Sequence, residues 1–204
     1  MEAPAEMCLR DRKRCETRQR IVDTGRRLFS EKGFEGTTLD AIALEAGISR
    51  RTFFSYFTSK EDVLLDTCRT AVGAIRPNLL EDREQTVPIE AARACLLRFV
   101  SRFETKESII DDRLLRSTEA LRARKQAIYA EMEGALFAAL CERWPSASQR
   151  DALRLVATAA IGVLRVASEK WREENAKHPL AHYLRRNFEL LAKHVWHEPR
   201  SPAR

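Results

Sequence analysis

Apolar residues recur every three or four positions along most of the chain, which is the spacing of one face of an α-helix. The clearest stripe is formed by Ile89, Ala92, Leu96, Phe99, Val100 and Phe103. Three more stripes have the same period: Ile21, Val22, Leu28 and Phe29; Ile128, Met132, Leu136 and Leu140; and Leu180, Leu184, Leu191 and Val195. No segment alternates apolar and polar residues convincingly, as a half-buried strand would. The pattern predicts an all-α protein.

Residues that favour helix ends divide this pattern. Gly33 follows the first stripe and can end that helix in the left-handed conformation that glycine tolerates. Gly25 lies inside the same helix at a cost of about 1 kcal/mol relative to alanine, so we expect a close helix contact there. Ser59 precedes Asp62 by three residues, which predicts a longer helix whose capping residue donates its backbone N–H to the Asp62 carboxylate.

The last two long helices have their own start signals. Ser148 precedes Asp151 by three residues, and Pro179 suits a first helical position. We therefore expect helices over residues 148–171 and 179–196.

The first third of the chain has shorter segments than the rest. Two short helices are expected within residues 37–47 and 49–57, and the later periodic segments are longer. Only 7 Gly and 7 Pro among 204 residues leave few breaks between helices. We expect an N-terminal three-helix unit, assigned to residues 15–75, and a larger helical bundle over residues 76–197.

Composition limits the classes of partner. The formal net charge is +6 and the isoelectric point is near 9.3, which is compatible with a polyanionic partner without requiring one. The longest apolar run, residues 155–164, has half of the roughly 20 residues that cross a bilayer, so no membrane span is expected. The N-terminal segment lacks the apolar core of a secretory signal, which predicts a cytoplasmic protein.

The cysteines and histidines do not form a convincing site. Five cysteines are scattered without a C-x-x-C pair, which predicts free thiols in a reducing compartment. A redox switch through Cys68 or Cys95 stays open as an alternative. His178 and His182 have a metal-ligand spacing, but Pro179 separates them at a predicted helix start and no other residue completes the set. No metal and no cofactor are expected.

Residues 48–60, ISRRTFFSYFTSK, hold four aromatic residues, three cations and no acid. Phe53 is expected in the core, while Phe54 and Tyr56 lie on other faces. Taken alone, an amphipathic segment of this kind favours a solvated cationic face over a DNA-binding one.

The residues around this segment change that interpretation. Thr37 or Thr38 can cap a first short helix, Gly47 permits a tight turn, and Ser49 can cap a second short helix. A capped helix, a tight turn and a second capped helix are the layout of a helix-turn-helix.

The first turn of the second short helix holds Arg50, Arg51 and Thr52. In a helix-turn-helix this turn contacts base edges in the major groove. Arginine can pair with guanine through two hydrogen bonds, and a threonine hydroxyl can bond a base or a phosphate. The layout therefore predicts a DNA-binding surface.

Residues 17–65 resemble the TetR family of transcriptional regulators almost throughout. The resemblance is carried by Leu28-Phe29, Gly33-Phe34, Thr38, Ile42-Ala43, Ala46-Gly47-Ile48-Ser49, Tyr56-Phe57 and Ser59-Lys60. Two residues depart from the family pattern. Gly25 stands where alanine is usual, and Phe54 stands where a tyrosine is frequent. Phe54 lacks the hydroxyl that can reach a phosphate, and an apolar contact with a thymine methyl stays open.

The resemblance implies a set of DNA-contacting residues: Thr38, Ser49, Arg50, Arg51, Thr52, Phe54, Tyr56 and Lys60. The residues of the first turn after Ser49 would read the sequence. Thr38, Tyr56 and Lys60 would hold phosphates.

For the rest of the chain, the resemblance implies a ligand pocket and a dimer interface. The arrangement of predicted helices after Pro88, and the length of that part of the chain, resemble those of regulators with an acyl-CoA-like ligand domain. The candidate pocket residues are Phe99, Phe103, Ile128, Met132 and Phe137, although ordinary core positions use the same residue types. The last two long helices would pair with a second copy, with Leu155 and Leu184 in the interface, although packing within one chain would use the same residues.

The leading interpretation is a homodimeric repressor that leaves a palindromic operator on double-stranded DNA when a mainly apolar small molecule binds. One alternative is a helical enzyme or small-molecule-binding protein. The chain has no G-x-S-x-G, H-E-x-x-H or glycine-rich phosphate loop, which argues against an enzyme. A thiol-based redox regulator is the other alternative.

Overall fold

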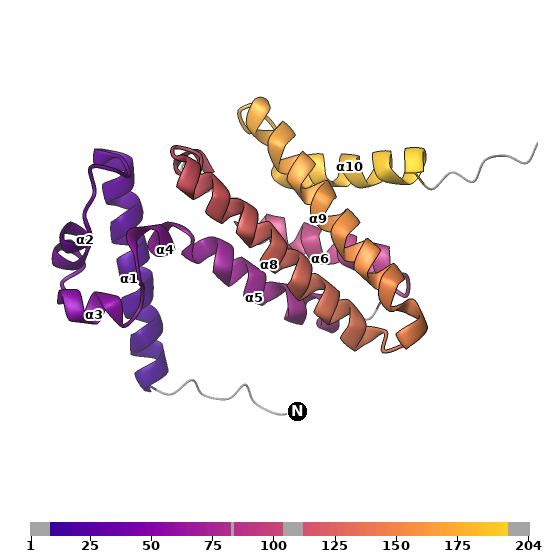
Figure 1. The fold of residues 1–204 in the computed structure, drawn as a ribbon, viewed down its shortest axis with the longest axis horizontal. Coiled ribbons are helices and arrows are strands. Elements are labelled where there is room, and N and C mark those ends of the chain that lie inside the picture. Colours follow the sequence, from indigo (N-terminus) through magenta and orange to yellow (C-terminus); the bar gives the residue numbers. More distant parts are fainter. Residues whose placement is uncertain (1–8, 83, 104–111, 196–204) are drawn as a thin grey trace, which may run out of the picture. The chain divides into compact units, whose positions relative to one another are not determined.

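The computed structural model describes residues 9–82, 84–103 and 112–195 (Figure 1). Within these ranges all regular elements are helices, which confirms the all-α prediction. The chain divides into two compact units. The N-terminal unit contains residues 1–67 and 110–123, and the C-terminal unit contains residues 68–109 and 124–204. Among the described residues, no helix is long and apolar enough to cross a membrane.

The N-terminal unit begins with four helices: α1 (Leu9–Lys32), α2 (Leu39–Glu45), α3 (Arg50–Phe54) and α4 (Lys60–Leu64). The apolar positions of each helix point to a shared core. Ile21, Leu28, Ile42, Phe53 and Val63 are each fully buried there. Burial of such side chains is worth about 1.5–3 kcal/mol each and fixes the short helices against the long one.

The ends of these helices follow the expected caps. Gly33 has φ +73° directly after α1, and Gly47 has φ +67° in the turn after α2, so both use the left-handed conformation. The hydroxyl of Thr38 accepts a hydrogen bond from the Ala41 N–H, and Ser49 accepts one from the Thr52 N–H. Both predicted caps are confirmed.

Gly25 on α1 lies against Val63 on α4. A Cβ atom at this position would lie 2.6 Å from Cγ1 of Val63, which is inside van der Waals contact. The expected close helix contact is therefore confirmed.

The start of α4 differs from the prediction in two ways. Ser59 caps the helix by accepting from the Asp62 N–H at 3.2 Å. The Asp62 carboxylate, however, bonds the N–H and hydroxyl of Thr58 instead of the N–H of Ser59. The predicted longer helix also breaks, because α4 ends at Leu64 and α5 begins at Asp66.

The C-terminal unit contains the longer helices: α5 (Asp66–Glu81), α6 (Pro88–Phe103), α8 (Glu119–Arg143), α9 (Arg150–Glu173) and α10 (Leu180–Val195), with α5 and α8 each starting in the N-terminal unit. Helix α9 packs against both α10 and α6, and α10 packs against α6. Fully buried side chains in this unit include Ile75, Leu79, Leu96, Leu136, Ala160 and Leu184.

Both predicted starts of the last two helices are off by one or two residues. Ser148 lies in a 3-10 turn, Ala147–Gln149, so it does not cap α9, which begins at Arg150. Pro179 precedes the first residue of α10, and its carbonyl accepts a hydrogen bond from the His182 N–H at 2.9 Å. Residue 196, the predicted end of the last helix, lies outside the described residues.

Two arginines fasten the C-terminal end of α5. Arg98 donates to the Asp82 carboxylate at 2.5 Å and to the Asn78 carbonyl at 2.7 Å. Arg143 donates to the carbonyls of Leu79 and Gln85. Cations can bind the free carbonyls at the C-terminal end of a helix and complement its dipole. Arg98 and Arg143 therefore attach the C-terminal end of α5 to α6 and α8.

Candidate nucleic-acid interface

Helices α2 and α3 are joined by a short turn that the backbone closes. The Gly47 N–H donates to the Leu44 carbonyl at 3.1 Å, and the Ile48 N–H donates to the Ala43 carbonyl at 3.0 Å. The left-handed φ of Gly47 allows both bonds, because residues with a Cβ rarely adopt it. The two helices therefore have a fixed relative orientation.

The first turn of α3 is held by its cap. Besides the bond to the Thr52 N–H at 3.0 Å, the Ser49 hydroxyl lies 2.8 Å from the hydroxyl of Thr52. These two hydroxyls share a hydrogen bond on the surface of the protein. Thr52 is thus pre-oriented at the start of the helix.

Helix α3 has an inner and an outer face. Phe53 is fully buried, whereas Phe54 is 45% exposed and both Arg50 and Arg51 are exposed. The prediction that Phe53 belongs to the core is confirmed. Two cations and an aromatic ring remain on the outer face.

Arg50 has a local partner on α2. Its Nη1 lies 3.1 and 3.2 Å from the two carboxylate oxygens of Asp40, and its guanidinium carbon lies 5.7 Å from the centre of the Phe54 ring. Because both side chains of this ion pair are more than half exposed, the pair is worth only about 0.2–1 kcal/mol. Arg50 is oriented by Asp40 and can exchange it for another acceptor.

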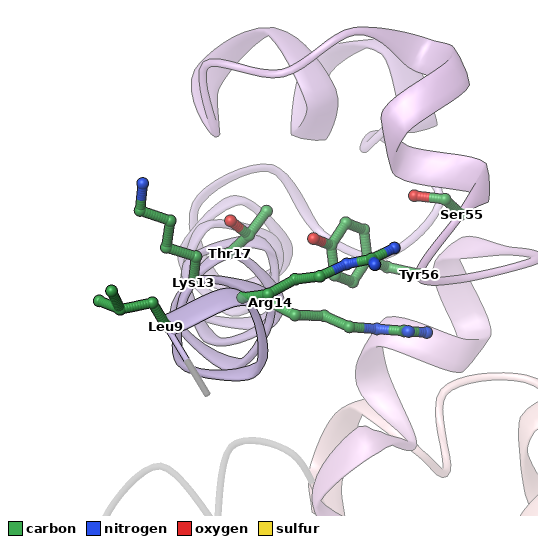
Figure 2. Close-up of a pocket in the computed structure, with 7 residues that line it drawn as sticks. Leu9, Lys13, Arg14, Thr17, Ser55 and Tyr56 are labelled. Carbon is green, nitrogen blue, oxygen red and sulfur yellow. The ribbon is translucent and has the colours of Figure 1, made fainter. Parts of the chain in front are cut away.

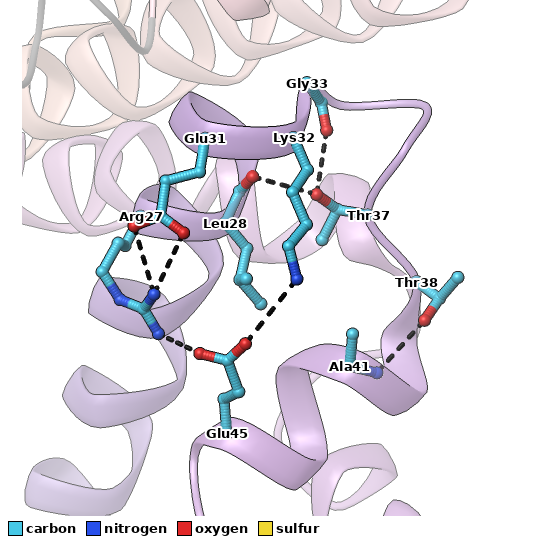
Figure 3. Close-up of polar contacts among 9 residues, drawn as sticks. All are labelled: Arg27, Leu28, Glu31, Lys32, Gly33, Thr37, Thr38, Ala41 and Glu45. Carbon is cyan, nitrogen blue, oxygen red and sulfur yellow. Dashed lines mark hydrogen bonds and ion pairs between the residues drawn. The ribbon is translucent and has the colours of Figure 1, made fainter.

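Ion pairs and hydrogen bonds attach α2 to α1 (Figure 3). Arg27 binds the carboxylates of Glu31 and Glu45, and Lys32 Nζ lies 3.9 Å from Glu45. The hydrogen bonds that Arg27 donates to Glu45 and to Glu31 raise the pKa of Arg27. The Thr37 hydroxyl donates to the Gly33 carbonyl at 2.8 Å, at the end of α1.

The ammonium group of Lys60 binds groups of the protein itself. Nζ donates to the carbonyl of Phe34 at 2.7 Å and to the carbonyl of Thr37 at 3.2 Å, and it lies 4.3 Å from the centre of the Phe34 ring. Only 18% of the side chain is exposed. The expected phosphate contact would have to compete with these bonds.

Tyr56 faces a hollow that the sequence pattern did not indicate. A space of about 600 Å³ is lined by Leu9, Arg10, Lys13, Arg14, Thr17, Ser55 and Tyr56 (Figure 2). We call it the α1 hollow. The sequence signal is the run RDRKR at residues 10–14. All of the expected DNA-contacting residues belong to the N-terminal unit, as does the α1 hollow.

The candidate pocket residues of the C-terminal unit are not equivalent. Phe99, Ile128 and Met132 are buried. Phe137 is half-buried, and the guanidinium carbons of Arg150 and Arg154 lie 5.2 and 5.1 Å from its ring centre. The side chain of Phe103 lies outside the described residues.

The residues expected at the dimer interface also differ from each other. Leu155 on α9 is 71% exposed, but Leu184 on α10 is fully buried within the chain. Leu184 is therefore a core residue, and its placement in the interface was wrong. Among the described residues of these helices, the exposed large apolar side chains are Leu155, Val166 and Leu190.

The thiol and imidazole groups offer little for redox or metal chemistry. Burial raises the pKa of Cys95 to about 11, and its Sγ donates to the Ile75 carbonyl at 3.5 Å. A thiol in this state is a poor nucleophile, which counts against Cys95 as a sensor. The rings of His178 and His182 lie 4.7 Å apart. In the described ranges, no three His, Cys, Asp or Glu side chains form a group that could hold a metal.

The capped α2, the glycine turn and the capped α3 with two exposed arginines define a helix-turn-helix protein. The family model of bacterial regulatory proteins of the tetR family matches residues 21–67, and the model of the MftR C-terminal domain matches residues 86–195. The chain belongs to the TetR family.

Two relatives match different shares of the chain. The putative mycofactocin biosynthesis transcriptional regulator MftR of Mycobacterium tuberculosis is 28% identical over 169 residues, which cover 81% of this chain and 84% of MftR. The uncharacterized HTH-type transcriptional regulator YerO of Bacillus subtilis is 47% identical over 58 residues, but these cover only 28% of this chain and 20% of YerO. Both relatives are transcriptional regulators by name.

A solved structure extends the likeness to nearly the whole chain. FadR of Thermus thermophilus, a TetR-family transcriptional repressor in complex with lauroyl-CoA, is 25% identical with a TM-score of 0.57. The match covers 92% of this chain and all of the FadR chain.

Proposed function

We propose that this protein is a homodimeric transcriptional repressor that binds operator DNA in the cytoplasm and leaves it when a mainly apolar small molecule binds. The observation that carries DNA binding is the outer face of α3. There Arg50 and Arg51 are exposed at the start of a capped helix whose Phe53 is anchored in the core. DNA binding belongs to residues 15–75, and ligand binding and dimerisation belong to residues 76–197.

The first turn of α3 reads the operator sequence. Arg50 and Arg51 pair with guanine edges, and Thr52 bonds a base or a phosphate from its position beside the Ser49 cap. Phe54, exposed one turn further on, packs against a thymine methyl.

Phosphates on either side are held by residues outside that turn. Thr38 lies at the exposed start of α2, where free backbone N–H groups favour an anion. Tyr56 contributes its hydroxyl from the edge of the α1 hollow. Lys60 acts indirectly, because its hydrogen bonds to Phe34 and Thr37 position the loop that carries Thr38.

Dimerisation uses an exposed apolar stripe of α9 together with α10. Leu155 and Val166 are eleven positions apart on α9, about three helical turns, so they share one face. Leu190 is also exposed on α10. A two-fold dimer presents two copies of α3 in opposite directions, so the operator is palindromic.

The effector binds the C-terminal unit. Phe99, Ile128 and Met132 supply buried apolar surface there; Phe103 and Phe137 belong to the same proposed set. Support for an acyl thioester comes from FadR, which holds lauroyl-CoA. The effector acts by favouring a dimer in which the two copies of α3 no longer match the spacing of the half-sites.

The test begins with capture of the genomic DNA that the protein binds. We expect a shared palindrome, and a duplex that carries it should bind the purified dimer more tightly than a scrambled duplex. If the captured fragments share no common sequence, the proposal of a site-specific regulator is wrong.

The same duplex then tests release. Acyl-CoA thioesters of increasing chain length are titrated into the bound sample, with free coenzyme A as the control for the polar part. We expect release that increases with chain length. Binding that stays unchanged across a broad library of apolar compounds would remove the effector from the proposal and leave DNA binding intact.

A further inference from the structure

The α1 hollow brings together two segments that are distant in the sequence. Its floor and one wall come from the first turns of α1, and the other wall comes from Ser55 and Tyr56, directly after α3. Its volume, about 600 Å³, is many times the ~30 Å³ share of one water molecule in the liquid. The space therefore admits a large hydrated group.

The cations of the hollow have no acidic partner among the residues that the structure describes. Three of its seven lining residues, Arg10, Lys13 and Arg14, are cations, and none is an acid. Among the described residues, no carboxylate forms an ion pair with any of these three. Their neighbour Arg12 differs, because it pairs with Glu16 at 3.4 Å on another face of α1.

Hydroxyl groups complete the lining. Thr17, Ser55 and Tyr56 each bring one to the space. In Figure 2 the Arg14 side chain reaches from α1 towards Ser55 and Tyr56, whereas Lys13 extends away from them. A guanidinium group beside hydroxyl donors suits the oxygens of a phosphate.

We propose that the α1 hollow binds a backbone phosphate of duplex DNA, with Arg14 and Arg10 as its cations and the Tyr56 hydroxyl as a further donor. This inference rests on the proposed function, because the DNA is the operator that α3 reads. It adds the cations of α1 to the phosphate contacts proposed for Thr38 and Tyr56, independently of the base sequence.

The openness of the arrangement favours a polymer over a small anion. The cations that face the space are themselves exposed, so a bound free phosphate would keep much of its contact with water. Tyr56 directly follows the helix that carries Arg50 and Arg51. A duplex seated on α3 therefore brings its sugar–phosphate chain near the hollow.

The decisive measurement is the salt dependence of operator binding. Arg14→Gln and the double change Arg10→Gln with Arg14→Gln remove cations from the hollow. Arg12→Gln is the matched control, since it removes the same charge from another face of the same helix. Thermal unfolding of each variant checks that the fold is kept.

The logarithm of the DNA-binding constant decreases linearly with the logarithm of the salt concentration. We expect this slope to become shallower by about 0.9 for each phosphate that the protein no longer binds, or by about 1.8 for two hollows in a dimer. When salt is raised from 50 to 200 mM, the unchanged protein should therefore lose affinity for the operator by a factor about 12 times larger than the factor for the double variant. The ratio between cognate and scrambled duplexes should stay the same. Arg12→Gln should leave the slope close to that of the unchanged protein.

The other outcomes separate the two proposals. If the unchanged protein prefers its operator but the double variant and Arg12→Gln have the same slope, the hollow holds no phosphate of DNA and the proposed function stands. Saturable binding of inorganic phosphate, followed by NMR on the DNA-free protein, together with an unchanged slope would assign the hollow to a free anion and overturn the DNA contact. If the unchanged protein binds no duplex selectively, the proposed function fails first.

Discussion

The ammonium nitrogen of Lys60 lies 2.7 Å from the carbonyl oxygen of Phe34, so the first residue of α4 holds the loop after α1. The same group donates to Thr37 and lies over the Phe34 ring. Hydrogen bonds from a charged donor contribute about 1.5–3 kcal/mol each when they are partly buried. Lys60 is thus placed to support the loop that leads into Thr38.

We predict that Lys60→Met destabilises the fold by at least about 1.5 kcal/mol, the lower value for one hydrogen bond from a charged donor, because two carbonyls lose such a donor. The salt slope of operator binding should change by less than the roughly 0.9 units per subunit expected when one phosphate is no longer bound. Urea unfolding and binding at several salt concentrations give both values. Lys32→Met, which removes an exposed cation 3.9 Å from Glu45, is the control. A stable Lys60→Met protein with a reduced slope would instead support a direct phosphate contact.

The arginines of α3 should control sequence preference. Arg50→Ala or Arg51→Ala should each weaken cognate binding by about 1–3 kcal/mol and relax the preference at one or two base positions. Asp40→Asn tests the orientation of Arg50, since it removes the carboxylate that Arg50 contacts. Binding to a panel of singly substituted duplexes measures each effect. Equal losses on cognate and scrambled duplexes would mean that these arginines do not read bases.

Gly25→Ala should destabilise the N-terminal unit by about 1–3 kcal/mol, because the added methyl group meets the Val63 side chain at 2.6 Å. The gain in helix propensity, about 1 kcal/mol, offsets only part of this. Adding Val63→Ala should recover part of the stability that the clash removes. Gly134→Ala in α8 is the control, because no atom lies within 4 Å of its new Cβ. Chemical denaturation of the three variants and of the unchanged protein measures the differences.

Leu155→Glu and Leu184→Glu should behave differently. Leu155 is 71% exposed, so a charge there should give a folded monomer if α9 forms the dimer interface. Leu184 is fully buried, so a charge there should unfold the C-terminal unit or make the protein insoluble. Sizing and circular dichroism distinguish the two results. An unmodified protein that stays monomeric at micromolar concentration would contradict the dimer.

Acid should weaken the corner where α5 ends. The hydrogen bond from Arg98 lowers the pKa of Asp82 from its ordinary value near 3.8. A carboxyl whose pKa is lowered by folding contributes stability above its unfolded pKa, and that contribution disappears as pH falls through the folded value. Asp82→Asn should therefore be less stable than the unchanged protein at pH 7, and the gap should narrow below pH 4.

Local sequence signals predicted local structure well. Thr38 and Ser49 cap the helices that their spacing indicated, and Gly33 and Gly47 adopt the expected left-handed conformation. Each of these depends on neighbours within a few residues. Ser148 shows the limit of such signals, because the chain continues through a 3-10 turn before α9 begins.

Features that depend on distant parts of the chain were harder to predict. Lys60 has the same side chain whether it meets a phosphate or the Phe34 carbonyl, 26 positions away in the sequence. Leu184 fits an apolar stripe whether that stripe packs inside the chain or against a second copy. The α1 hollow needs residues on both sides of the motif, so the basic run at residues 10–14 gave no indication of Tyr56 as its neighbour.

Helix α3 has only five residues, Arg50–Phe54, far fewer than the roughly 12–15 that a peptide needs to stay helical in water. Cut out as a peptide, this segment would not present its arginines in any fixed arrangement. An operator preference that resides in α3 would therefore not transfer to another protein with this segment alone. An engineer who wishes to transplant or redirect it must move the supporting scaffold as well, from Leu9 to Leu64, and change only the outer residues of α3.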